Sequence, residues 1–171
     1  MNRRTVLAGL AAAAAAAVAG GGALAIRRHR QAAVAVGTFE IEKTEAAWRE
    51  LLTPEQFAVL RQQHTEAPFT SPLNNEHRKG IFACAGCSLP LYDAAAKFDS
   101  GTGWPSFFQP LPQAIATSTD QSWLGTRTEV HCRRCGGHLG HVFDDGPPPT
   151  GLRYCMNGVA LTFTPAPAAS S

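Results

Sequence analysis

The chain has 171 residues, a length that suits one domain with a buried core and is short for two. Charged residues make up 16% of it and the formal net charge is +2, with part of the basic excess within the first thirty positions. Because the remainder is close to neutral, no surface for nucleic acid is expected.

Residues 1–26 have the composition of a targeting segment. Arg3 and Arg4 precede a weakly apolar stretch rich in alanine, which resembles a twin-arginine export signal. We therefore expect an exported, periplasmic protein, with cleavage after Ala19 or Ala25. The alternative is an uncleaved anchor in the inner membrane that faces the periplasm, because the apolar stretch is long enough to span a bilayer.

Two short helices are predicted after this segment. Thr44 to Leu52 has apolar residues at helical spacing. Thr53 followed by Pro54 is typical of an N-cap with proline in the first turn, and it predicts a second helix that ends near Gln63. The expected organisation is a linker over residues 27–43, one domain over residues 44–164 and a disordered tail over residues 165–171.

From about residue 71 the chain consists of short apolar runs separated by Gly, Pro, Asp and Ser. Examples are the runs Gly80–Cys84, Ala114–Thr117 and Val159–Phe163. This spacing favours an antiparallel β domain over βαβ units.

Four of the five cysteines form two Cys-x-x-Cys pairs, Cys84 with Cys87 and Cys132 with Cys135. Two such turns complete a tetrahedral site with no open position, which predicts one structural zinc ion per chain that joins two distant hairpins. A 2Fe–2S cluster would use the same ligands, and two disulfides are the alternative in an exported protein. Zinc is favoured because the twin-arginine route carries folded proteins, so the ion could be loaded in the cytoplasm.

The fifth cysteine, Cys155, is the candidate nucleophile. A free thiol, with a pKa of about 8.5, is mostly protonated at neutral pH, so positive charge or hydrogen-bond donors nearby must favour the thiolate. If its segment is a strand, Arg153 and Asn157 share a face with Cys155. The alternatives are that Cys155 is an inert buried thiol, that Arg153 is an exposed strand residue and that Asn157 is a turn residue.

Six segments together resemble a known family, the B-type methionine sulfoxide reductases, over roughly residues 44 to 164. They are Leu52–Gln56, Pro68–Pro72, Cys84–Cys87, Asp99–Phe107, His138–Pro147 and Gly151–Asn157. The family reduces methionine-R-sulfoxide to methionine. The resemblance implies oxidised proteins as substrates and a mainly β fold. That fold has two antiparallel sheets and short N-terminal helices, held together by a Cys₄ zinc site.

The resemblance also implies an active site. It places His138 and His141 there, with Asp145 in a position to orient a water or an imidazole. Histidine suits this role because the sulfoxide oxygen is a poor leaving group until it is protonated. The substrate's methyl group is apolar and its sulfur is partly positive, so both suit contact with an indole ring. Trp104 would supply this ring, and Phe143 would add to the pocket. Without these motifs the indole would be expected in the core, and two histidines at this spacing are as often metal ligands as catalysts, but four thiolates already saturate the ion.

The expected reaction is attack of the Cys155 thiolate on the sulfoxide sulfur with His141 as the acid, which leaves a sulfenic acid. Many members of the family carry a resolving cysteine in the loop before the tryptophan, where this chain has Thr102. An external thiol, from a thioredoxin-like protein or a small molecule, is therefore expected to restore Cys155 in a monomeric enzyme. Gly158 is a second departure, since the family usually has serine there.

Two other classes of function compete with this interpretation. A zinc-ribbon binding module would explain the paired cysteines but not the additional motifs, and the chain has no basic stripe. A thiol–disulfide oxidoreductase would use one Cys-x-x-Cys pair for chemistry, yet two pairs without a βαβ pattern fit a metal better.

Overall fold

The computed structural model describes residues 39–122 and 125–167. The segment interpreted as an export signal or anchor lies outside these residues, as do most of the linker and the end of the predicted tail. Within the described ranges, no helix is both long enough and apolar enough to cross a membrane.

Two helices open the described part of the chain, α1 (Glu45–Leu51) and α2 (Pro54–Gln62). A capping box begins α2, because the Thr53 hydroxyl accepts the Gln56 N–H and the Gln56 side chain accepts the Thr53 N–H. Both predicted helices are confirmed, and their ends differ from the predicted ones by about one residue, the usual uncertainty of helix ends.

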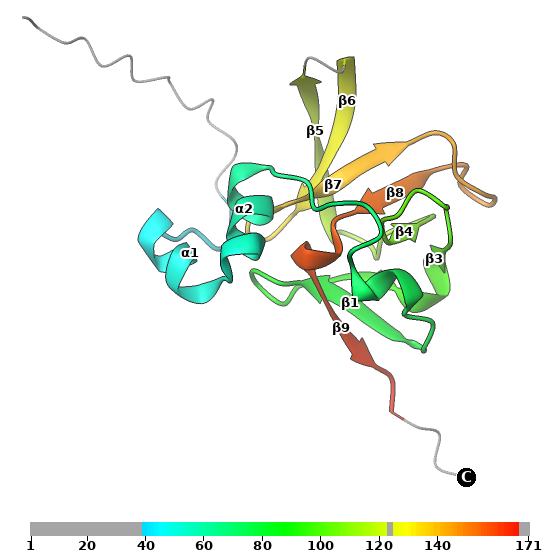
Figure 1. Ribbon diagram of the computed structural model, residues 1–171, viewed down its shortest axis with the longest axis horizontal. Coiled ribbons are helices and arrows are strands. Elements are labelled where there is room, and N and C mark those ends of the chain that lie inside the picture. Colours follow the sequence, from blue (N-terminus) through cyan, green and yellow to red (C-terminus); the bar gives the residue numbers. More distant parts are fainter. Residues whose placement is uncertain (1–38, 123–124, 168–171) are drawn as a thin grey trace, which may run out of the picture. The chain divides into compact units, whose positions relative to one another are not determined.

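The described strands form two antiparallel sheets (Figure 1). The smaller sheet has the order β2-β1-β9, with strands β1 (Gly80–Cys84), β2 (Pro90–Asp93) and β9 (Leu161–Pro165). The larger sheet has the order β3-β4-β8-β7-β6-β5, with strands β3 (Lys97–Phe98), β4 (Ser106–Phe107), β5 (Ile115–Ser122), β6 (Gly125–Cys132), β7 (His138–Phe143) and β8 (Arg153–Met156). The predicted fold, mainly β with two antiparallel sheets and short N-terminal helices, is confirmed.

Aromatic rings from both sheets meet in the core. Phe82 of β1 and Tyr92 of β2 contact Phe107 of β4, with ring centroids 5.0 and 4.2 Å apart. The Tyr92 hydroxyl donates a hydrogen bond to the Met156 sulfur over 3.1 Å, and Met156 is fully buried. Successive side chains of a strand point to opposite faces, so Cys155 points away from this core. The core therefore fixes β8 and leaves the thiol on the other face of the larger sheet.

Candidate active site and metal centre

One row of polar side chains crosses the larger sheet. Cys155 of β8 lies opposite Ser106 of β4 on one side and His141 of β7 on the other. His141 in turn lies opposite Glu129 of β6, and Glu129 lies opposite Ser118 of β5. Directly opposite residues of antiparallel strands have neighbouring side chains on one face. The sheet register therefore places the candidate nucleophile beside the candidate acid.

A hollow of about 110 Å³ opens at this row. It is lined by Thr65, Trp104, Arg127, Gly140, His141, Phe143, Cys155 and Asn157. The structure thus brings together the thiol, one histidine, the asparagine and both aromatic residues that the sequence pointed to. A hollow of this size accepts the end of one side chain, and the apolar rings with a few polar groups give it the composition of a ligand site.

Arg153 lies two residues before Cys155 and is mostly buried. Its guanidinium donates to both carboxylate oxygens of Asp145 at 2.8 Å and lies 4.4 Å from the centre of the Phe143 ring. The hydrogen bonds that Arg153 donates to Asp145 raise the pKa of Arg153, and interactions with Cys155 raise it further. A permanent positive charge therefore lies on the same strand as Cys155, two residues away. Asp145, expected to orient a water or an imidazole, lies against Arg153.

His141 is held by a pair of residues that sequence reasoning did not identify. Its Nε2 lies 2.8 Å from Oδ2 of Asp120, and Arg127 donates to the same oxygen over 2.7 Å. Burial lowers the pKa of His141, and the hydrogen bond with Asp120 opposes this shift. The only sequence signal is an acidic and a basic residue placed opposite each other across the β5–β6 hairpin.

His138 is adjacent to the hollow but does not line it. Its Nδ1 lies 2.7 Å from Oε1 of Glu129, and the Ser118 hydroxyl donates to the other carboxylate oxygen. The hydrogen bond from His138 lowers the pKa of Glu129 to about 2. The rings of His138 and His141 are 5.4 Å apart, so the two histidines predicted for the site are neighbours with different partners.

Glu66, also missed from the sequence, organises the opposite wall. Its backbone carbonyl accepts a hydrogen bond from the Trp104 indole at 3.1 Å, and its backbone N–H donates to the Asn157 side chain at 2.9 Å. Its carboxylate accepts two further backbone N–H groups at the start of η3 (Gly158–Ala160). The amide nitrogen of Asn157 donates to a carbonyl of β7, so this side chain mainly holds the chain in place. One residue thus fixes both the indole and the turn after β8.

Thr102 lies where a resolving cysteine would be. Its hydroxyl is 3.8 Å from the Cys155 sulfur and 2.8 Å from the Ser100 hydroxyl, which contacts that of Ser106 at 2.7 Å. A short chain of hydroxyl groups therefore ends at the thiol.

Gly158, the other departure from the expected pattern, lies against Ser71. A Cβ at position 158 would overlap the Ser71 hydroxyl. The serine that the sequence lacks after Asn157 is therefore matched by a serine from another segment that occupies the same space.

The four remaining cysteines form one cluster with all sulfurs within 4.8 Å of one another. The sulfurs of Cys84 and Cys135 are 3.7 Å apart, and those of Cys87 and Cys132 are 3.5 Å apart. A tetrahedron with metal–sulfur bonds of about 2.3 Å has sulfur–sulfur edges of about 3.8 Å. All the cysteines are free thiols, in contrast to the disulfide alternative. The cluster can hold a metal ion.

This cluster links the two sheets. One Cys-x-x-Cys turn follows β1 of the smaller sheet, and the other joins β6 to β7 of the larger sheet. Hydrogen bonds from neighbouring sulfurs, Cys132 first, raise the pKa of Cys84. Four thiolates this close repel one another, so full ionisation requires a cation between them.

Comparison with known proteins adds an independent finding. The SelR domain matches residues 52–165, from the end of α1 to the end of β9. The peptide methionine sulfoxide reductase MsrB of Agrobacterium fabrum is 53% identical over 127 residues, which cover 74% of this chain and 94% of that protein. The proteins of the same name from Thiobacillus denitrificans and Methanosarcina mazei are 54% and 52% identical, and the matches cover 94% and 90% of those proteins and 72% and 73% of this chain.

Proposed function

The chain belongs to the SelR family of B-type peptide methionine sulfoxide reductases, and from this premise we propose how its site reduces methionine-R-sulfoxide. The observation that carries the mechanism is the placement of Cys155 directly opposite His141 on adjacent strands, at a hollow lined by Trp104. This arrangement puts a nucleophile, an acid and an apolar wall around one small substrate group.

Cys155 acts as the nucleophile. Its thiolate attacks the sulfoxide sulfur. The sulfur–oxygen bond breaks, the oxygen is transferred to the cysteine and methionine leaves. The sulfoxide sulfur gains two electrons and the cysteine sulfur loses two, so the product on the enzyme is a sulfenic acid.

His141 supplies the proton. The sulfoxide oxygen becomes a leaving group when an imidazolium donates to it, and the hydrogen bond with Asp120 favours that charged form against burial. The proton ends on the oxygen of the sulfenic acid, and His141 becomes neutral.

The aromatic residues select the substrate. Trp104 and Phe143 present apolar surface to the methyl group and the methionine side chain, while the thiol approaches the sulfur from the floor of the hollow. Because a sulfoxide sulfur is a stereocentre, one placement of methyl and oxygen relative to Trp104 and His141 fits only one epimer. We assign that epimer as R.

An external thiol regenerates the enzyme. Thr102 contacts Cys155 but has no sulfur, and the other cysteines are gathered in the cluster. A thioredoxin-like protein or a small thiol attacks the sulfenic acid, which releases water and forms a mixed disulfide. A second thiol of the reductant then breaks this disulfide and restores Cys155.

We assign the cluster to one structural zinc ion, held by Cys84, Cys87, Cys132 and Cys135. Four thiolates leave a tetrahedral ion no open position, so when bound it stabilises the fold and takes no part in the reaction.

For the cellular setting we propose a monomeric, exported, periplasmic enzyme that acts on oxidised proteins, with the inner-membrane anchor as the alternative. The exported or anchored location rests on the composition of residues 1–26.

The test measures the reduction of both epimers of N-acetyl-methionine sulfoxide amide with dithiothreitol. The native chain should reduce the R epimer, and Cys155→Ser should lower the rate by on the order of a thousandfold or more. Circular dichroism and metal content of the variant should equal those of the native chain. An active Cys155→Ser variant, or a native chain active only on the S epimer, would refute the mechanism.

A further inference from the structure

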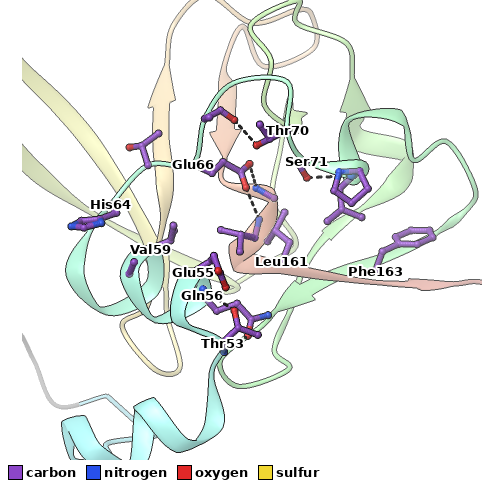
Figure 2. Close-up of a pocket in the computed structure, with 17 residues that line it drawn as sticks. Thr53, Glu55, Gln56, Val59, His64, Glu66, Thr70, Ser71, Leu161 and Phe163 are labelled. Atoms are coloured by element: carbon purple, nitrogen blue, oxygen red, sulfur yellow. Dashed lines mark hydrogen bonds between the residues drawn. The ribbon is translucent and has the colours of Figure 1, made fainter.

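A groove of about 760 Å³ lies between α2, the loop that follows it, and the turn from η3 into β9 (Figure 2). Apolar side chains that are buried or half-buried line it, among them Val59, Leu161 and Phe163. Exposed polar side chains such as Glu55 and His64 stand at its edge. The groove thus has an apolar interior that is open to a ligand.

This groove adjoins the catalytic hollow. Thr65 lines both, and its side chain is exposed. The next residue, Glu66, lines the groove, while its backbone holds Trp104 and Asn157 on the side of the hollow. A single loop backbone therefore separates the two. An extended segment of two or three residues, at about 3.3 Å per residue, is long enough to cross it.

The volumes of the groove and of the catalytic hollow imply that the two bind different parts of a substrate. The catalytic hollow, at about 110 Å³, holds the end of one side chain, so the rest of a polypeptide substrate must lie on the surface around it. Two other surface hollows, one along residues 77–81 and one along residues 43–62, share no residue with the catalytic hollow. The groove, by contrast, shares Thr65 with it.

The lining also indicates the chemistry of the bound segment. The acidic side chains of the groove are Glu55 and Glu66, and the Glu66 carboxylate is already bonded to two backbone N–H groups. An acidic segment would be repelled, whereas an apolar side chain would be removed from water against Val59, Leu161 and Phe163.

We propose that this groove is a substrate subsite. It binds the stretch of oxidised polypeptide next to the methionine sulfoxide and selects an apolar side chain within two or three residues of it. The inference rests on the proposed function, because it takes Cys155 and its hollow as the point where the sulfoxide is reduced.

The first test uses the native full-length chain and dithiothreitol. The substrates are N-acetyl-methionine-R-sulfoxide amide and matched peptides with Gly, Leu or Glu at the positions next to the sulfoxide. Leucine in the favoured position should raise kcat/KM about tenfold over glycine, and glutamate should not raise it. Equal kcat/KM for Leu and Gly peptides at every position would overturn the subsite, while no activity on the small substrate would refute the proposed function itself.

The second test fills the groove. Ala58 of α2 lines it, whereas Gln62 of the same helix is exposed and does not. Ala58→Arg should reduce the ratio of kcat/KM for the leucine peptide to that for the glycine peptide to near one. Gln62→Arg, which adds the same charge to the same helix, should keep the native ratio. A native ratio in Ala58→Arg would overturn the proposal.

A third measurement identifies the occupant directly. A peptide with a photoreactive phenylalanine analogue beside the sulfoxide is irradiated with the native chain, and adducts are located by mass spectrometry. Adducts on residues 53–73 or 158–163 support the subsite, and adducts confined to β5 and β6 contradict it. A native dimer that becomes monomeric in Ala58→Arg would mean that a second copy fills the groove, and would also overturn the proposal.

Discussion

The acid that we propose, His141 of β7, is bonded to a residue of β5, two strands away. Asp120 shares one carboxylate oxygen between His141 and Arg127, so the imidazole is fixed in position and bonded to an anion. Burial, the largest effect, lowers the pKa of His141, as does the charge of Arg127, while the hydrogen bond and charge of Asp120 raise it. The protonated fraction of His141 at a given pH therefore depends on a side chain that need not touch the substrate.

We predict a shifted pH profile for Asp120→Asn. The amide keeps the shape but removes the negative charge, so the pKa of His141 falls and less imidazolium is present at each pH. The alkaline limb of kcat against pH should therefore move to lower pH. The charged and titratable groups around His141 are Asp120 on β5, Arg127 and Glu129 on β6, His138 on β7 and Cys155 on β8. Asp144→Asn, an exposed control, should keep the native profile, and an unmoved limb in Asp120→Asn would contradict the role.

The contact between Thr102 and Cys155 leads to a second prediction at this scale. A cysteine at position 102 would bring a sulfur to the place of a hydroxyl that is now 3.8 Å from Cys155. After one turnover without reductant, Thr102→Cys should form an intramolecular disulfide, measured as the loss of both free thiols by labelling and mass spectrometry. Thr117→Cys, on an exposed position of β5, should form none. The same disulfide in the native chain, from any cysteine to Cys155, would contradict the single-cysteine cycle.

At the scale of elements, the turn after β8 is shaped by what surrounds it. Glu66 bonds to the backbone of η3, and Ser71 fills the space next to Gly158. The loop between α2 and β1 and the end of β8 are thus packed as one unit. This is the same loop that separates the groove from the catalytic hollow, so its position bears on both.

We predict that Gly158→Ser destabilises the protein. The new side chain would overlap Ser71, and overpacking of this kind lowers the free energy of unfolding by about 1–3 kcal/mol. The double variant with Ser71→Gly should recover at least half of this loss. Urea denaturation of the native chain, both single variants and the double variant gives the coupling energy. Additive single effects would show that the two positions do not share this space.

For the whole molecule, the sulfur cluster is one link between the sheets outside the aromatic core. A metal ion there would tie the β1 turn to the β6–β7 turn, and so tie the smaller sheet to the sheet that carries the active site. Loss of the ion would loosen the packing that fixes β8.

We therefore expect about one equivalent of zinc per purified chain, measured by elemental analysis. Cys132→Ser or a strong chelator should remove it and lower Tm by at least about 10 °C, with loss of activity. Cys155→Ser should retain both the zinc and the native Tm, which separates the structural cysteines from the reactive one. Full Tm and activity in the metal-free chain would contradict the structural role.

The parts of this molecule that were predictable are those with local signals. Thr53 and Pro54 determine a helix start, and each Cys-x-x-Cys pair comes from one turn, so spacing alone indicates them. Asp120, Glu129 and Glu66 could not be found in this way, because their role depends on which strands pair and in which register. The partner of Asp145 could not be predicted either, because its spacing from His141 along the chain does not show that it pairs with Arg153.

The order of the cysteines along the chain has a consequence for synthesis. All four sulfurs of the cluster, from Cys84 to Cys135, emerge from the ribosome before Cys155, and β9 follows later to complete the smaller sheet beside β1. Chains fold from the N-terminus as they are made. A metal captured at that stage would remove the other four thiols from exchange, so Cys155, the proposed nucleophile, would be added to a protein in which none of them is left as a disulfide partner.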